Sequence, residues 1–239
     1  MAARLALASI FWCAMACMAA GGAVSTSNAS PATAEQVLDR AEAAEAAIRD
    51  VRLKFTQVTR LKATAEEQET VGELVVLKSP ERFKVTFMSP VRQIAYYDGS
   101  RLVLYYPETR QAFRQKAALA DLSRLIGVNP ASPAGTFRRG YRASLAGCDG
   151  TGCRIVFSRT TAAGAVDAAG EAAWKVRVSA TTWLMEDASF ENSEIRISLK
   201  CRDYLINRGL NAESIRLALP KGVEIVEGIP QISGQEWAR

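Results

Sequence analysis

Few residues of this sequence have side chains suited to catalysis. The chain of 239 residues contains no histidine, so it lacks the usual general base near neutral pH and the commonest transition-metal ligand. Nucleophilic sites of the Ser-His and Cys-His types are excluded for the same reason. The carboxylates of Glu66, Glu67 and Glu69 are clustered, but they fall in an expected hairpin turn, where charge is usually solvated. No nucleophile-elbow, P-loop or dinucleotide motif occurs. We therefore expect no catalytic residue, no metal site, no cofactor and no enzymatic activity.

Cysteine pairing is the other chemistry that the sequence offers. Cys148 and Cys153 flank a turn-rich tetrapeptide, so the two thiols could face each other across a hairpin and form a disulfide in an oxidising compartment. A zinc or redox site fits less well, because C-x4-C is not a metal-knuckle spacing and no second ligand pair exists. Cys201 is left over, and we expect it to be a buried apolar residue.

The N-terminus predicts export from the cytoplasm. Arg4 supplies a positive charge, residues 5–20 form an apolar run, and small residues follow at positions 21–23. We therefore predict a signal peptide over residues 1–23 and a flexible lead-in over residues 24–33. The apolar run is shorter than the roughly 20 residues that span a bilayer, so no permanent transmembrane helix is expected.

A second cleavage site is possible within the same run. Ala14-Met15-Ala16-Cys17 is a loose version of the lipoprotein box, in which the cysteine becomes acylated after cleavage. Cleavage before Cys17 would leave the protein anchored to a membrane. Cleavage after residue 23 would release it, so the sequence leaves both localisations open.

Composition and charge are those of an ordinary globular protein. Hydrophobic residues make up 49% of the chain and charged residues 23%. The formal net charge of +5 is spread along the sequence with only mild clusters, so nucleic acid is not expected as a partner.

Hydrophobic periodicity predicts one helix followed by many strands. Val37, Ala41, Ala44, Ile48 and Val51 recur at helical spacing, which indicates an amphipathic helix beginning near Thr33. Apolar and polar residues then alternate with period two, and we expect about eleven strands. The alternating segments are residues 53–60, 71–77, 83–87, 94–97, 102–106, 111–116, 141–145, 154–159, 175–180, 182–190, 193–200 and 214–219.

The connections between the strands decide the topology. Turns such as Ser79-Pro80-Glu81 are too short to hold a crossover helix, so neighbouring strands must be antiparallel. Residues 117–126 predict a second short helix, which would form a flap over the sheet with the proline-bearing loop 128–135. The fold class is therefore mainly β with α: an incomplete antiparallel β-barrel covered by a helical lid, formed by residues 34–239 as a single domain.

Such a barrel predicts an apolar cavity. Two helices cannot fill the mouth of so wide a sheet as densely as a second sheet would, so room is left for a hydrocarbon chain. Phe83, Val85 and Phe87 alternate with Arg82, Lys84 and Thr86, which places the apolar side chains on the inner face. The same residues would also form an ordinary packed core. Further candidates for the cavity are Phe55, Ile94, Tyr96, Leu102 and Leu104.

Several short motifs in order resemble the LolA/LolB outer-membrane lipoprotein-sorting proteins. The resemblance extends from about residue 34 to residue 227. The motifs are Phe55-Thr56-Gln57, Gly72-Glu73-Leu74, Pro80-Glu81-Arg82-Phe83, Asp98-Gly99 followed by Leu102, Tyr105-Tyr106-Pro107, and Pro220-Lys221-Gly222-Val223.

The resemblance implies a periplasmic carrier that holds the acyl chains of lipoproteins, or of another lipid, in its cavity. An inner-membrane release complex and an outer-membrane acceptor would then be its partners. The nearest alternative is a membrane-anchored acceptor like LolB, held through Cys17. A third possibility is a sensor or interaction module of the cell envelope on the same fold.

One position departs from the family. The carriers place an arginine, which holds the lid closed, immediately before the proline that matches Pro80, whereas this chain has Ser79. Lys78 is adjacent, but in a strand it would point to the opposite face from Ser79. The resemblance therefore does not imply how the lid is held in this chain.

Overall fold

A single large β-sheet organises the molecule. The structure is a computed structural model, and it describes residues 33–117, 141–159 and 173–228. Within these residues twelve strands form one sheet, in the order β12-β6-β5-β4-β3-β2-β1-β11-β10-β9-β8-β7. The strands are β1 (Asp50–Leu61), β2 (Glu67–Lys78), β3 (Glu81–Ser89), β4 (Gln93–Tyr97), β5 (Arg101–Tyr106), β6 (Gln111–Lys116), β7 (Tyr141–Asp149), β8 (Gly152–Arg159), β9 (Ala173–Ser179), β10 (Met185–Glu191), β11 (Ile195–Ile206) and β12 (Glu224–Glu227).

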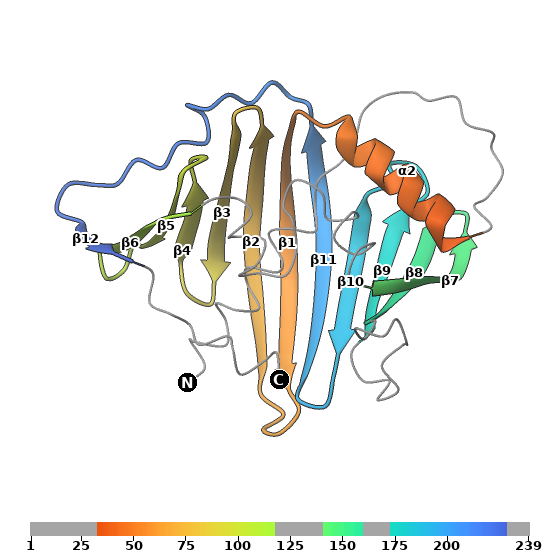
Figure 1. Cartoon of the computed structure of the whole chain (residues 1–239). Coiled ribbons are helices and arrows are strands. Elements are labelled where there is room, and N and C mark those ends of the chain that lie inside the picture. Colours follow the sequence, from red (N-terminus) through yellow and green to blue (C-terminus); the bar gives the residue numbers. More distant parts are fainter. Residues whose placement is uncertain (1–32, 118–140, 160–172, 229–239) are drawn as a thin grey trace.

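The sheet consists of two meanders joined in the middle. Strands β1 to β6 follow one another as antiparallel neighbours, as do β7 to β11, and β1 pairs with β11 to join the two halves. The outermost strands, β12 and β7, do not pair with each other, so the sheet is an unclosed barrel (Figure 1). The predicted fold class, an incomplete antiparallel barrel with a helical cover, is confirmed.

Two details of the strand prediction are wrong. Residues 214–219 were expected to form a strand, but they form a turn and irregular chain outside the sheet. The last strand is instead β12, which pairs with β6 in parallel and not antiparallel orientation. The long connection between β11 and β12 makes this possible, because it runs along the upper edge of the sheet to its far side (Figure 1).

The described residues contain one helix, α2 (Ala34–Ala46). Thr33 caps its N-terminus, and the Thr33 hydroxyl accepts a hydrogen bond of 3.2 Å from the backbone N–H of Gln36. Figure 1 shows α2 crossing the upper parts of β9 and β8 toward β7.

Several predicted features lie outside the described residues: the signal peptide, Cys17, the second helix over 117–126 and the loop 128–135.

The two faces of the sheet have different covers. On the helix face, Val37 and Leu38 of α2 share one hydrophobic core with side chains of strands on both sides of β1. On the opposite face, Ile215 is fully buried against Val75, Leu77 and Tyr96. Ile215 belongs to residues 208–217, which we call the crossing segment. The face of the sheet that this segment covers is called the crossing face.

Gly72 of β2 gives space to an aromatic side chain on the helix face. It lies opposite Phe55 of β1 and Phe87 of β3, and these two rings meet edge to face with centroids 5.9 Å apart. A Cβ atom on Gly72 would lie 2.8 Å from the backbone oxygen of Thr86 and would overlap the Phe55 ring. The ring of Phe55 therefore occupies the space that a side chain at position 72 would need.

We expect Gly72→Ala to lower the free energy of unfolding by about 1–3 kcal/mol, because the backbone of Thr86 cannot move aside cheaply. Gly150→Ala is the matched control, since a Cβ there meets no atom within 4 Å. Chemical denaturation of both variants provides the measurement. An equal loss of stability in both would show that the packing of Phe55 on Gly72 is unimportant.

Candidate functional site

The helix face of β1 to β6 carries continuous rows of apolar side chains. Each row follows the register of the sheet, so that its members lie side by side on neighbouring strands. The middle row contains Leu53, Leu74, Val85, Ala95, Leu104 and Phe113. The upper row, nearer the start of β1, contains Val51, Val76, Phe83, Tyr97 and Leu102.

The sequence singled out six residues that the structure brings together on this face. All six are at most 3% exposed and belong to one hydrophobic core. They are Phe55, Phe83, Val85, Phe87, Leu102 and Leu104. Their burial fits both a packed interior and a lipid-binding face, so their role in binding remains a prediction.

Ile94 and Tyr96 must be corrected. Ala95 lies opposite Val85 and therefore shares its face, so the neighbouring Ile94 and Tyr96 point to the other side of the sheet. Tyr96 packs there against the crossing segment. The sequence pattern of β4 was misleading because both faces of this strand are covered. Its two faces therefore do not differ clearly in polarity, and the inward side could not be identified from the sequence.

Lys78, and not Ser79, holds the end of the helix. The Lys78 ammonium donates a hydrogen bond to the carbonyl oxygen of Glu45 in the last turn of α2. That turn contains no basic residue of its own, so β2 supplies the cation that the negative end of the helix dipole favours. Burial lowers the pKa of Lys78, and the carboxylates of Glu45 and Glu81 oppose this effect. Ser79 lies exposed in the following turn.

Asn207 fixes the junction between α2 and β1. Its side-chain oxygen accepts a hydrogen bond of 2.7 Å from the N–H of Arg49, and its amide nitrogen donates one of 3.2 Å to the carbonyl of Ala47. The buried carboxylate of Asp50 accepts hydrogen bonds of 2.8 and 3.1 Å from the N–H groups of Arg208 and Gly209. The end of β11 is therefore attached to the segment that leaves the helix.

The hairpin of β7 and β8 forms part of the surface on which α2 lies. Cys148 and Cys153, the pair singled out from the sequence, are joined by a disulfide between directly opposed positions of the two strands. Cys153 belongs to the same core as the helix residues. Cys201 is buried, as expected, in that core.

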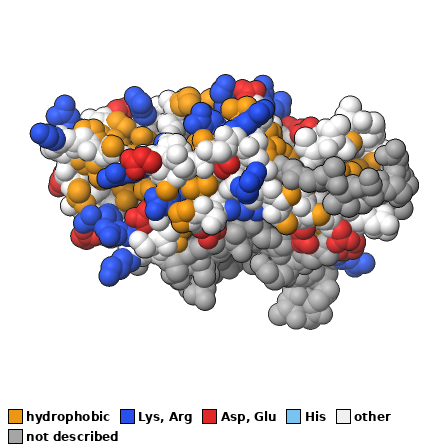
Figure 2. Space-filling model, turned by 90° about the horizontal axis from the view of Figure 1, so that it is seen from above, with side chains coloured by type: hydrophobic (Ala, Val, Ile, Leu, Met, Phe, Trp, Pro, Cys, Tyr) orange, Lys and Arg blue, Asp and Glu red, His pale blue; other side chains and the backbone are white. Residues whose placement is uncertain are grey.

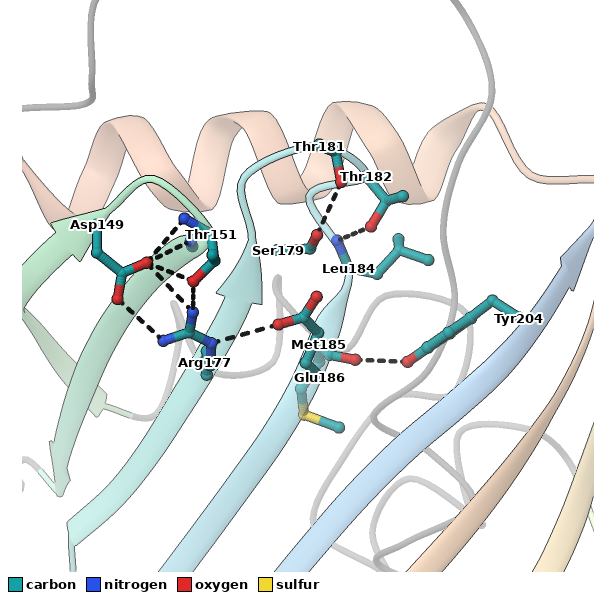
Figure 3. A network of polar contacts seen from close by, with 11 residues as sticks. Asp149, Thr151, Arg177, Ser179, Thr181, Thr182, Leu184, Met185, Glu186 and Tyr204 are labelled. Carbon is teal, nitrogen blue, oxygen red and sulfur yellow. Dashed lines mark hydrogen bonds and ion pairs between the residues drawn. The ribbon is translucent and has the colours of Figure 1, made fainter.

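Arg177 connects this hairpin to the next strands. Its guanidinium lies between Asp149 and Thr151 in the β7–β8 turn and Glu186 of β10, with α2 passing nearby (Figure 3). Hydrogen bonds from Thr151, Gly152 and Arg177 hold the pKa of Asp149 well below its ordinary value. Arg40 of α2 lies 4.7 Å from the ring centroid of Trp183, in the connection between β9 and β10.

The upper surface of the molecule carries charges of both signs. Figure 2 shows basic and acidic side chains interspersed there, with hydrophobic side chains visible between them. Exposed ion pairs among the described residues include Lys54–Asp203 at 2.9 Å and Arg216–Glu213 at 3.4 Å. Such a mixed surface does not favour a polyanion.

Sequence reasoning missed the polar groups of the helix face. Gln57, Thr70 and Gln93 are at most 4% exposed, although each is polar. The resemblance drew attention to Gln57 only as part of a motif. The signal that could have found them is a polar residue at the inward position of an alternating strand, as for Gln57 two residues after Phe55.

Comparison with known proteins supports the fold and goes no further. No family model and no curated protein matches the chain. Among solved structures, an uncharacterized conserved protein from Thermus thermophilus has a TM-score of 0.54 at 14% identity, over 82% of this chain and 99% of that one. A LolA superfamily protein from Nitrosomonas europaea has a TM-score of 0.39 at 16% identity, over 78% and 99% of the two chains.

A putative outer membrane lipoprotein-sorting protein domain from Vibrio parahaemolyticus is also similar, with a TM-score of 0.37 at 12% identity, over 76% of this chain and 94% of that one. Of these three structures, the one from Thermus thermophilus has a TM-score above 0.5 and supports the observed fold, while the resemblance to the lipoprotein-sorting proteins stays a prediction. Identities this low say nothing about the ligand. As to membranes, none of the helical structure in the described residues has the length and apolar character that a membrane crossing requires.

We expect Lys78→Met to loosen the C-terminal end of α2 and to lower the free energy of unfolding by about 1–2 kcal/mol, because a charge-assisted hydrogen bond is lost. Hydrogen exchange of the α2 amides and chemical denaturation are the measurements. Lys200→Met, at an exposed position of β11, is the control. Unchanged exchange in α2 of the Lys78 variant would contradict the proposed attachment.

Asp149→Asn removes one charge from the Arg177 network and keeps an oxygen that can accept hydrogen bonds. Because the pKa of Asp149 is lowered in the folded state, its ionisation stabilises the protein above the ordinary carboxyl pKa, and this contribution is lost as the pH falls. We expect the variant to unfold at a lower temperature than the parent protein at pH 7. The difference should shrink below about pH 4. Thermal unfolding from pH 7 to pH 2.5 tests this, and a difference independent of pH would oppose it.

Proposed function

We propose that this protein is an exported lipid-binding carrier of the cell envelope, which takes up the acyl chains of lipoproteins or of another lipid on the helix face. The observation that carries the proposal is the pair of continuous apolar rows, one across β1 to β6 and the other across β1 to β5. An acyl chain is itself a continuous apolar rod, and such rows offer it contacts along its whole length.

The energetics favour a chain as the guest. Each CH₂ group that leaves water contributes about 0.8 kcal/mol, so ten methylenes contribute about 8 kcal/mol before the cost of ordering the chain. The side chains of the rows carry no formal charge and few hydrogen-bond donors. Selectivity among acyl chains would therefore depend on the shape and depth of the binding face.

The carrier acts without catalysis in this proposal. The chain has no histidine, and the described residues contain no cluster of three or more side chains that could hold a metal ion. Uptake and release of a lipid need neither, because no covalent bond changes. The binding of partners at the inner and outer membranes would set the direction of transfer.

The membrane-anchored acceptor differs from the soluble carrier in its N-terminus. Mass spectrometry of the mature protein from its own host distinguishes the two. An N-terminal residue after position 23 supports the soluble periplasmic carrier, and a triacylated Cys17 supports the anchored acceptor. A sensor of the cell envelope is the remaining alternative, and it would bind a protein partner after delipidation without taking up an acyl probe.

We expect Val85→Glu and Phe87→Glu each to abolish binding of a fluorescent acyl probe, because each puts a carboxylate into the apolar helix face. Lys84→Glu makes the same change on the crossing face and should leave binding within about twofold. Fluorescence titration measures the affinity, and circular dichroism verifies that each variant is folded. Equal effects of all three substitutions would place the binding surface elsewhere.

A further inference from the structure

Buried polar side chains without charge gather at one end of the helix face. Below the middle row lies a row with Phe55, Gly72 and Phe87, in which Gln93 is the cross-strand partner of Phe87. Gln57 and Thr70 are partners in the row below that. Gln57, Thr70 and Gln93 are 2%, 2% and 4% exposed, so the lower end of this face is polar although it is shielded from water.

Gln93 and Tyr106 form the best placed pair of these groups. The Gln93 amide nitrogen donates a hydrogen bond of 3.2 Å to the Tyr106 hydroxyl. Tyr106 packs against the same core as the apolar rows, and its ring meets that of Phe113 with centroids 5.9 Å apart. The Tyr106 hydroxyl thus has a donor, and within the described ranges it has no acceptor for its own proton. A tyrosine hydroxyl is protonated at neutral pH, and burial raises the pKa of Tyr106 further above its ordinary value.

The charge of these rows limits what the pair can bind. Gln57, Thr70, Gln93 and Tyr106 are all neutral, and Glu224 of β12, at the edge of the sheet, accepts a hydrogen bond from Gln111. The side-chain hydrogen bonds of Gln57 and Gln93 within the described ranges go to hydroxyl groups, and none goes to a lysine or an arginine, so an anion buried here would be uncompensated by these contacts, which is costly. A neutral oxygen that accepts hydrogen bonds is the group that fits.

The other buried polar residues do not share this property. Glu45 and Asp50 are charged and lie where α2 joins β1, and Ser179 lies at the end of β9, beside the turn to β10. Asp50 is occupied by backbone N–H groups, and Ser179 interacts with Thr181 at 3.1 Å. The neutral end of the helix face is therefore distinct from the charged end, with the apolar rows between the two.

We propose that the helix face binds lipids through a neutral acyl carbonyl, that of an ester or an amide, which accepts a hydrogen bond from the Gln93–Tyr106 pair while the chain extends over the apolar rows. This inference rests on the proposed function and deepens it, since it names the ligand as an acyl ester or amide and excludes a free fatty acid in its ionised form. The headgroup beyond the carbonyl would lie outside the row of Phe87.

The test compares three radiolabelled probes of matched chain length at pH 8: methyl dodecanoate, dodecanoate and an alkane. Equilibrium dialysis with the full-length mature protein gives the affinities. We expect the ester to bind about fivefold more tightly than the alkane, which corresponds to one hydrogen bond. The dodecanoate anion should bind more weakly than the ester.

Two variants assign the effect to the pair. Tyr106→Phe and Gln93→Leu should each reduce the advantage of the ester over the alkane to about twofold or less, while the affinity for the alkane stays unchanged. Tyr105→Phe is the matched control, because Tyr105 is buried on the opposite face, and it should keep the full advantage. The melting temperature of each variant verifies that it is folded.

The outcomes separate this inference from the proposed function. If the parent protein binds the ester and the alkane equally, or the anion most tightly, the carbonyl contact is refuted and the acyl-chain carrier stands. Retention of the ester advantage in Tyr106→Phe and Gln93→Leu also refutes it. If the parent protein binds none of the three probes, the proposed function itself fails.

Discussion

The exclusion of water from one side of six consecutive strands is the constraint on which this structure depends. Leu53, Leu74 and Val85 begin a row that continues to Phe113 on β6, so the apolar surface is much wider than one helix. In the described residues, α2 lies over the opposite half of the sheet, across β9 and β8 (Figure 1). Leu53, Leu74 and Val85 are at most 1% exposed, so this face is shielded from water in the structure, as an apolar area of that size requires.

The position of α2 follows from contacts at both of its ends. At its C-terminus, Lys78 and Asn207 bind the last carbonyls. Lys78 is the last residue of β2 and Asn207 directly follows β11, the two strands that flank β1. Farther toward its N-terminus, Arg40 contacts the turn between β9 and β10, which lies beside the Arg177 network. The helix is therefore attached at both ends, and the hydrogen bonds to Lys78 and Asn207 are concentrated at its C-terminal end. A cover that must open while the sheet stays intact would be expected to open away from that attachment.

The sequence predicted the strands of the first meander well, because alternation in β3 is produced by local contrast: Phe83, Val85 and Phe87 face the core, while Lys84 faces the other side. It failed where tertiary contacts remove that contrast. Tyr96 is buried by the crossing segment, so β4 is apolar on both faces and its register cannot be read locally. The prediction of a strand over residues 214–219 was wrong for the same reason. Ile215 is apolar because it packs against Val75 and Leu77, and not because it belongs to an alternating strand.

The polar residues of the helix face are informative because a simple apolar interior would not need them. Burial of an amide costs free energy unless a partner is provided, and a leucine at position 93 would pack beside Phe87 without that cost. Gln93 is instead partnered by Tyr106, whose pKa is raised by burial. A purely structural role would be complete once every donor and acceptor of the pair is satisfied within the chain. The one hydrogen bond within the pair leaves the Tyr106 O–H and the second N–H of the Gln93 amide as donors, and in the proposed complex the carbonyl of an acyl chain would accept from them.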